Sequence, residues 1–177
     1  MKQTIGITMG CPVGIGPEII LRFFESFNQE PDRQAVVLGD AGVLRHASAT
    51  MNIPGRIVDW QPGNPIASGA VPVYALSSLP VQDLRWGKPD AETGRAMAAY
   101  IEKAVRLTRQ GILSALVTCP ITKSALKLAG YDYPGHTEML AHLTGSRQHL
   151  MMMAGNCLLY TSPSPRDRTR SRMPSSA

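Results

Sequence analysis

A glycine-rich loop near the start of the chain has the residue types of an anion-binding site. Residues 7–18 read Ile-Thr-Met-Gly-Cys-Pro-Val-Gly-Ile-Gly-Pro-Glu and join a β-type run to a helical pattern. Glycines let a ligand approach the backbone, and the free amides of a helix N-terminus suit anions. The loop lacks the spacing of a dinucleotide fingerprint or a P-loop. Two interpretations of the loop therefore remain open. Either Gly10 and Gly14 contact an anionic ligand, or the loop is a purely structural turn.

Histidine 136 has the most polar surroundings of the four histidines. It follows a Pro134-Gly135 turn and precedes Thr137 and Glu138, which predicts a loop. A neutral imidazole and a hydroxyl can both hydrogen-bond an oxygen-rich substrate, whereas a solvated surface histidine is the alternative. No two histidines have the i, i+4 spacing of a helical metal site, so no metal site is expected within this chain. The remaining three are interpreted as structural: His46, His142 and His149.

Two further side chains have a chemical and a structural interpretation each. Lys123 follows the end of an expected strand, where it would meet a phosphate or carboxylate or else be a solvated helix residue. Cys11 stands in the glycine loop at a helix start, a setting that can lower the pKa of a thiol. A small side chain filling a tight turn is the other interpretation of Cys11, and the pattern favours it.

Alternating strand and helix patterns would position these residues. Strands are predicted at 4–8, 35–40, 56–60, 71–76, 112–118 and 148–156, and helices at 15–27, 42–50, 91–109 and 121–128. The apolar face of 15–27 is expected to lie on a sheet, and the runs 35–40 and 112–118 to be buried strands. This order predicts an α/β fold with a doubly wound parallel sheet, in which ligands bind at the carboxyl ends of the strands.

Composition places the chain among globular proteins of a reducing compartment. It has 177 residues, 44% of them hydrophobic and 18% charged, enough for the core of an α/β domain. Its three cysteines include no C-x-x-C pair, which argues against a disulfide framework and a zinc site and favours the cytoplasm. No apolar run approaches the ~20 residues of a membrane span, and no secretion signal is recognised at the N-terminus.

The basic character of the chain comes mostly from its last residues. The formal net charge is +5, and residues 161–177 contribute +3 through four arginines and Asp167. This Ser/Pro/Arg segment has no apolar face, so disorder is expected. We therefore expect residues 1–156 to be part of a folded domain and residues 157–177 to be a disordered, non-native tail, with a natural basic tail as the alternative. A nucleic-acid partner is not expected, because the excess charge lies in that tail.

Four motifs in order resemble the 4-hydroxythreonine-4-phosphate dehydrogenase family. They are the glycine loop 7–18, the helical stretch 94–104, the segment 115–123 (Ala-Leu-Val-Thr-Cys-Pro-Ile-Thr-Lys), and 134–138 (Pro-Gly-His-Thr-Glu). With the intervening sequence they span residues 4 to about 156. Cys11 departs from the pattern, because the family usually has Asp there.

The resemblance implies an isocitrate/isopropylmalate dehydrogenase-like α/β/α fold, truncated here, and a homodimer. The implied reaction is NAD-dependent oxidation and decarboxylation of 4-phosphohydroxy-L-threonine to 3-amino-2-oxopropyl phosphate, in vitamin B6 (pyridoxine 5'-phosphate) biosynthesis. His136 and Thr137 match the family's substrate-binding pair. The family's divalent metal ion (Zn, Mg or Co) is held by histidines beyond residue 156, so the chain as written is expected to be inactive.

Two alternatives remain open at this point. A related enzyme could act on another four-carbon sugar-acid phosphate, such as threonate or erythronate 4-phosphate, and Cys11 favours this to a small extent. A non-catalytic phosphate-binding fragment that uses Gly10, Gly14 and Lys123 is the second.

Overall fold

The computed structural model describes residues 3–27, 32–154 and 159–162, and the chain divides into two compact units, the first of which ends at Leu140. The first unit is built on a five-stranded sheet with the order β3-β4-β2-β1-β5, in which every pair of neighbours is parallel. Its strands are β1 (Gln3–Thr8), β2 (Arg33–Gly39), β3 (Arg56–Asp59), β4 (Ala70–Ala75) and β5 (Ala115–Thr118). The predicted α/β class with a parallel sheet is confirmed.

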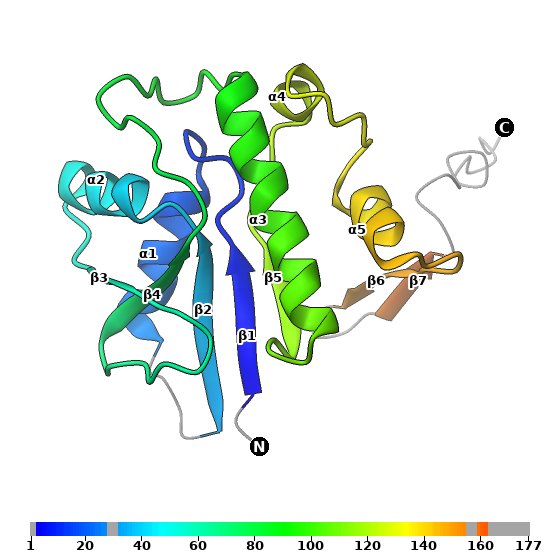
Figure 1. Ribbon diagram of the computed structural model, residues 1–177, viewed down its shortest axis with the longest axis horizontal. Coiled ribbons are helices and arrows are strands. Elements are labelled where there is room, and N and C mark those ends of the chain that lie inside the picture. The colour runs from blue at the N-terminus through cyan, green and yellow to red at the C-terminus, as the bar shows by residue number, and fades with distance from the viewer. Residues whose placement is uncertain (1–2, 28–31, 155–158, 163–177) are drawn as a thin grey trace, which may run out of the picture. The chain divides into compact units, whose positions relative to one another are not determined.

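Helices cover both faces of this sheet (Figure 1). The helices are α1 (Gly16–Ser26), α2 (Ala41–Met51), α3 (Ala91–Arg109), α4 (Lys123–Leu128) and α5 (His136–Thr144), the last of which extends past the end of the first unit. Helix α3 crosses β1, β2 and β5 on one face, whereas α1 and α2 pack against the other. The predicted helices are thus present, and α5 is an additional one that the sequence pattern did not predict.

The alternation of side chains along β2 divides the core between the two faces. Val36 and Leu38 pack with Ala104 and Leu107 of α3. Their neighbours Ala35 and Val37 belong to the cluster that α1 and α2 complete on the opposite face. Because successive strand residues point to opposite sides, one apolar run supplies both cores. This is why residues 35–39 form a continuous apolar stretch in the sequence.

Helix α3 begins and ends where its sequence predicts. Asp90 accepts a hydrogen bond from the Thr93 amide at 2.9 Å, and Thr93 Oγ1 accepts one from the Asp90 amide at 2.8 Å, which makes a reciprocal cap. Gly94 lies so close to α4 that any side chain there would collide with the carbonyl oxygen of Ala125. The cap fixes where α3 begins, and the close approach at Gly94 allows α4 to pack directly against α3.

The prediction that the apolar face of α1 lies on the sheet is confirmed in part. Ile20 is buried in the core cluster and Phe24 packs against it, whereas Ile15, Ile19 and Phe23 are exposed. The prediction about β5 was wrong. Strand β5 was expected to be buried, yet Val117 is 50% exposed. The apolar pattern identified the correct elements, but the described residues cover these side chains only in part.

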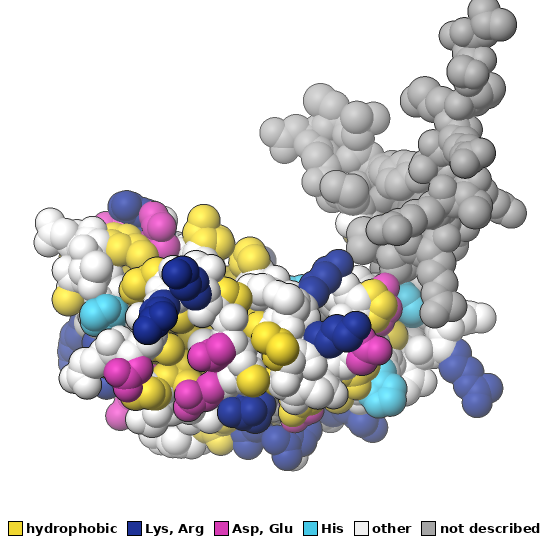
Figure 2. Space-filling model, turned by 90° about the horizontal axis from the view of Figure 1, so that it is seen from above, with side chains coloured by type: hydrophobic (Ala, Val, Ile, Leu, Met, Phe, Trp, Pro, Cys, Tyr) yellow, Lys and Arg dark blue, Asp and Glu magenta, His cyan; other side chains and the backbone are white. Residues whose placement is uncertain are grey.

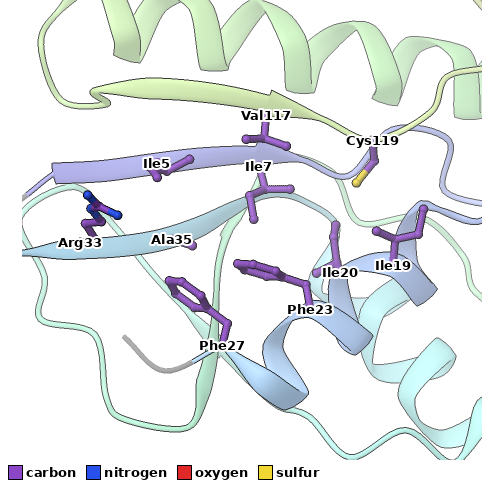
Figure 3. A pocket seen from close by; sticks show the side chains of 10 residues that line it. All are labelled: Ile5, Ile7, Ile19, Ile20, Phe23, Phe27, Arg33, Ala35, Val117 and Cys119. Carbon is purple, nitrogen blue, oxygen red and sulfur yellow. The ribbon is translucent and has the colours of Figure 1, made fainter. Parts of the chain in front are cut away.

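An open apolar groove lies on the sheet beside α1. Its volume is about 360 Å³, and its walls are the side chains of β1 and β5 on one side and of α1 on the other (Figure 3). Ile7 and Val117 face it from the strands, and Phe23 and Phe27 face it from the helix, with their rings stacked at 4.6 Å. The core on this side of the sheet is therefore partly open to solvent.

The second unit contains a two-stranded antiparallel hairpin of β6 (Met151–Ala154) and β7 (Leu159–Ser162). The sequence pattern predicted a strand at 148–156, in agreement with β6. Disorder was predicted from residue 157 onward, whereas Leu159–Ser162 is a strand, since Leu, Tyr and Thr favour extended backbone. Residues 157–158 and 163–177 lie outside the described residues. In the described part of the chain, no helix is both long and apolar enough to cross a membrane.

Candidate functional site

The loops that follow β1 and β5 are joined by backbone hydrogen bonds at the carboxyl end of the sheet. The Cys119 amide donates to the Thr8 carbonyl at 3.1 Å, and the Cys11 amide donates to the Pro120 carbonyl at 2.9 Å. Residues far apart in the sequence, in the glycine loop and in the segment before Lys123, therefore lie side by side. This edge is where a doubly wound sheet binds ligands.

Gly10 is required by this junction of the two loops. It has a φ of +68°, and any side chain on it would collide with the carbonyl oxygen of Pro120. Gly10 is buried, and the close packing of the two loops leaves no room for a side chain there. Gly14 is half-buried and closer to solvent. Substrate contact by Gly10 and Gly14 stays a prediction.

His136 is the first residue of α5 rather than a loop residue, which corrects the sequence prediction. The turn at Pro134 and Gly135 ends immediately before the helix, and a turn of this kind is also a common way to enter one. Its Nε2 atom is buried and has no hydrogen-bond partner among the described residues. Burial lowers the pKa of His136 below its ordinary value, which favours the neutral imidazole.

Lys123 and Glu138 flank the turn that leads to His136. A side chain placed on Gly135 would meet Glu138 Oε2 at 3.5 Å and Lys123 Cε at 3.8 Å. Thr137, the second residue of α5, is half-buried. The first amides of a helix lack partners within the helix and favour negative charge. A cation, an imidazole with an unpartnered nitrogen, a hydroxyl and a helix N-terminus thus lie together, with one carboxylate among them.

The sequence analysis placed Thr8 at the carboxyl end of a strand but assigned no role to its hydroxyl. Thr8 is the last residue of β1 and is fully buried, and its Oγ1 atom has no partner among the described residues. A buried hydroxyl without a hydrogen bond is unfavourable and uncommon. The sequence signal was weak, because threonine is ordinary in a strand.

A buried polar network lies at the end of the neighbouring strand β2 and was also missed. Asp40 is 1% exposed, and its carboxylate accepts hydrogen bonds from Ser77 Oγ at 2.7 Å, the Leu79 amide at 2.8 Å and the Val43 amide at 3.0 Å. Ser77 Oγ lies 2.6 Å from the Tyr100 hydroxyl, and burial raises the pKa of Tyr100 strongly. Asp40 stands immediately before α2, which is the position of a helix cap. Its other two partners, Ser77 and Leu79, are 37 and 39 residues away in the sequence, so local patterns could not reveal them.

The two described cysteines are buried and free. Cys11 is 3% exposed, in agreement with a small side chain that fills the turn. Burial raises the pKa of Cys119 to about 11, so its thiol is protonated at neutral pH. Neither thiol is presented to solvent as a nucleophile would need to be.

The other histidine of the first unit, His46, does not join the site around His136. His46 lies on α2 and its ring stacks on that of Trp86 with 6.3 Å between centroids. His149 belongs to the second unit and has a buried Nδ1 without a described partner. Within residues 3–27, 32–154 and 159–162, no group of three His, Cys, Asp or Glu side chains could hold a metal ion. Viewed onto the carboxyl ends of the strands, acidic, basic and apolar side chains are interspersed (Figure 2).

Comparison with known proteins identifies the family. The model of the family described as "Pyridoxal phosphate biosynthetic protein PdxA" matches residues 31–163. The chain belongs to the PdxA family. The match extends past residue 156, where the sequence analysis placed the end of the native domain, and so includes the strands of the hairpin.

Curated PdxA relatives carry two kinds of name. The 4-hydroxythreonine-4-phosphate dehydrogenase of Desulfosudis oleivorans is 44% identical over 159 residues, which are 89% of this chain and 47% of that protein. The D-threonate 4-phosphate dehydrogenase of Cupriavidus necator is 38% identical over 151 residues, 84% of this chain and 45% of that protein. The chain therefore spans about half the length of the curated relatives that it matches.

Solved structures agree with this assignment. A 4-hydroxythreonine-4-phosphate dehydrogenase from Klebsiella pneumoniae superposes with a TM-score of 0.81 at 34% identity, covering 90% of this chain and 49% of that one. The enzyme of the same name from Burkholderia phymatum gives 0.80 at 32% identity, with 91% and 49% covered. The family expected from the four motifs is thus confirmed.

Proposed function

We propose that this chain is the substrate-contacting part of an NAD-dependent dehydrogenase that oxidises and decarboxylates 4-phosphohydroxy-L-threonine in vitamin B6 biosynthesis. The names of the PdxA relatives support this class of activity. The observation that carries the proposal is the unpartnered, buried Nε2 of His136 at the start of α5. A buried nitrogen of this kind is satisfied when a ligand supplies the missing hydrogen bond.

The proposed roles follow from the chemistry of each group. Neutral His136 and the Thr137 hydroxyl would hydrogen-bond the polar atoms of the substrate, since an imidazole and a hydroxyl can each donate or accept. Lys123 and the N-terminal amides of α5 would interact with its phosphate or carboxylate. Glu138 would oppose an anion close to its own carboxylate, which favours an anion position on the Lys123 side of Gly135.

The cofactor, the metal ion and the assembly belong to the same proposal. The described residues do not suit a divalent metal ion, since they bring no three ligand side chains together. No step of the reaction is assigned to a metal ion held by this region. NAD, the metal ion and the homodimer are expected of the whole protein. The cytoplasm is proposed because Cys11 and Cys119 are free thiols, as is usual in a reducing compartment.

D-threonate 4-phosphate is the second candidate substrate. The relative of that name from Cupriavidus necator is 38% identical, close enough to the 44% of the first relative that identity does not separate the two. Cys11 is the feature that favours this alternative, because the family usually has Asp at that position.

The test is an assay of NADH formation by the complete protein encoded around this sequence, with each phosphorylated substrate in turn. We expect kcat/KM to be at least about tenfold higher for 4-phosphohydroxy-L-threonine, which corresponds to ~1.4 kcal/mol of transition-state binding. His136→Ala should raise KM, whereas His46→Ala, on α2 beside Trp86, should not. Preference for D-threonate 4-phosphate would select the second candidate, and no NADH from either substrate would contradict the proposal.

A further inference from the structure

The buried residues Asp40, Ser77 and Tyr100 form a hydrogen-bonded chain with a fixed direction. Ser77 has one hydroxyl hydrogen, which it donates to Asp40 Oδ2, so the Tyr100 hydroxyl must be the donor to Ser77 Oγ. Asp40 is 1% exposed and Tyr100 is 0% exposed, so neither side chain is accessible to a ligand from solvent. Any part that they play in ligand binding must therefore act through other residues.

This chain holds the start of the segment that joins β4 to α3. Residues 77–90, all of which the structure describes, contain neither a helix nor a strand, and they lie at the carboxyl end of the sheet (Figure 1). The Leu79 amide also donates to Asp40 Oδ2, at 2.8 Å. Buried backbone amides outside regular structure need an acceptor from elsewhere, and here the Asp40 carboxylate supplies it.

The far end of the same segment is hydrogen-bonded to the glycine loop. The Gly87 amide donates to the Val13 carbonyl at 2.8 Å. The neighbouring Trp86 packs on the other side, where its ring stacks on that of His46 of α2. Residues 77–87 are thus bound at one end to a buried carboxylate and at the other to the loop that follows β1.

We propose that Asp40, Ser77 and Tyr100 are positioning residues, which hold residues 77–87 against the glycine loop and so set the position of that loop at the ligand-binding edge of the sheet. The glycine loop is joined in turn to the segment before Lys123, through the bond from the Cys11 amide to the Pro120 carbonyl. Residues that contact a ligand bind it well only when a supporting set of residues fixes them in place. The inference rests on the proposed function, because only a site at this edge gives the position of the loop a consequence for activity.

Amide hydrogen exchange in this chain tests whether the buried residues hold the loop. Tyr100→Phe removes one hydroxyl, and we expect the Gly87 amide to exchange at least about threefold faster, as measured by NMR. Ser77→Ala should have the same effect, and the double variant should match Ser77→Ala alone, because Tyr100 acts through Ser77. Ser48→Ala is the matched control. It removes the hydroxyl that donates to the Ile53 carbonyl at 2.7 Å, near the other end of α2, and should leave exchange at Gly87 unchanged.

Steady-state kinetics test whether holding the loop matters to the site. The enzyme is the complete protein encoded around this sequence, assayed by NADH formation. Tyr100→Phe should raise the KM of the phosphorylated substrate, of NAD or of both by at least about threefold and change kcat less, since a displaced loop weakens ligand binding. Ser48→Ala should raise neither KM, although it also loses one buried hydrogen bond.

Three outcomes separate the possible failures. Unchanged exchange at Gly87 in both Tyr100→Phe and Ser77→Ala would overturn the inference. Faster exchange with both KM values unchanged would overturn the role in the site and leave a network that serves the fold alone. No NADH from the unaltered complete protein would contradict the proposed function and with it the role in the site, whereas the exchange rates would still decide whether the buried residues hold the loop.

Discussion

The two faces of the parallel sheet differ in how completely they are packed. Under α3, Met97, Ile101 and Ala104 are fully buried, and the layer is complete within the described residues. On the other face, α1 leaves Phe23 36% exposed and Val117 50% exposed. Both faces thus carry a buried core, but the core on the α1 side ends at an apolar edge that is partly open to solvent. The difference separates a closed core from an apolar face that is partly open to solvent.

The largest expected effect tests the finished face. Ile101→Ala should lower the free energy of unfolding by about 2–5 kcal/mol, because it leaves a cavity among fully buried side chains. Urea denaturation measures the loss. Ile112→Ala is the control, since Ile112 is 36% exposed, and it should cost under about 1 kcal/mol. Equal losses for the two variants would contradict a difference in packing.

Removing the buried carboxylate should have the next largest effect. Asp40→Ala leaves the amides of Val43 and Leu79 without their acceptor, and each unsatisfied buried donor is costly, so we expect a loss of about 1–3 kcal/mol. Asp40→Asn keeps one acceptor oxygen and should lose less. Urea denaturation of the two variants orders them. An alanine variant as stable as the asparagine variant would show that the network contributes little.

Neighbouring phenylalanines of α1 allow the two environments to be compared on one helix. Phe24 packs against the main core cluster, whereas Phe23 lines the open groove. Phe23→Ala should lower the free energy of unfolding by about 1–2 kcal/mol, below the ~3–5 kcal/mol typical of a buried phenylalanine. Phe24→Ala should cost more in the same urea experiment. A larger loss at Phe23 would mean that the groove is closed in this chain in solution.

The sequence predicted the elements better than their surroundings. Residues 91–109 are an amphipathic run between an Asp cap and a glycine, and α3 has those same bounds. The apolar face of α1 and the apolar run of β5 were also recognised, but their burial was not predictable. Hydrophobic periodicity reports which face of an element is apolar, whereas the burial of each side chain depends on what packs against that face in the tertiary structure.

The sequence predicted which residue types form the candidate site, but it predicted less of how they are arranged in space. The turn at Pro134 and Gly135 pointed to His136, and the position of Lys123 after β5 followed from the strand pattern. The proximity of Lys123 to Gly135 depends on how the chain returns to the sheet, which local patterns do not encode. The unpartnered Thr8 hydroxyl was missed for the same reason, since only tertiary packing makes it buried.

His136 is a second place where the described residues leave a buried group without a partner, and it should make the stability of the chain depend on pH. Its pKa is lowered by burial, so the unfolded chain binds a proton more readily than the folded one. Stability should therefore be full above the unfolded pKa of about 6.5 and should fall as the pH drops below it. Thermal unfolding between pH 8 and pH 5 measures this. His136→Gln should reduce the slope and His46→Gln should not, whereas equal slopes in all three proteins would contradict it.

The smallest expected effect is at the most exposed apolar residue of the groove. Val117→Thr replaces a methyl group with a hydroxyl at nearly constant shape, which is costly in a dry core but not in contact with water. Because half of Val117 is exposed, the free energy of unfolding of this chain should change by no more than about 0.5 kcal/mol. The same substitution at Val73 on β4, which is fully buried, should cost more, since there the hydroxyl would be buried in an apolar core. Equal losses at the two positions would mean that Val117 is covered in this chain in solution.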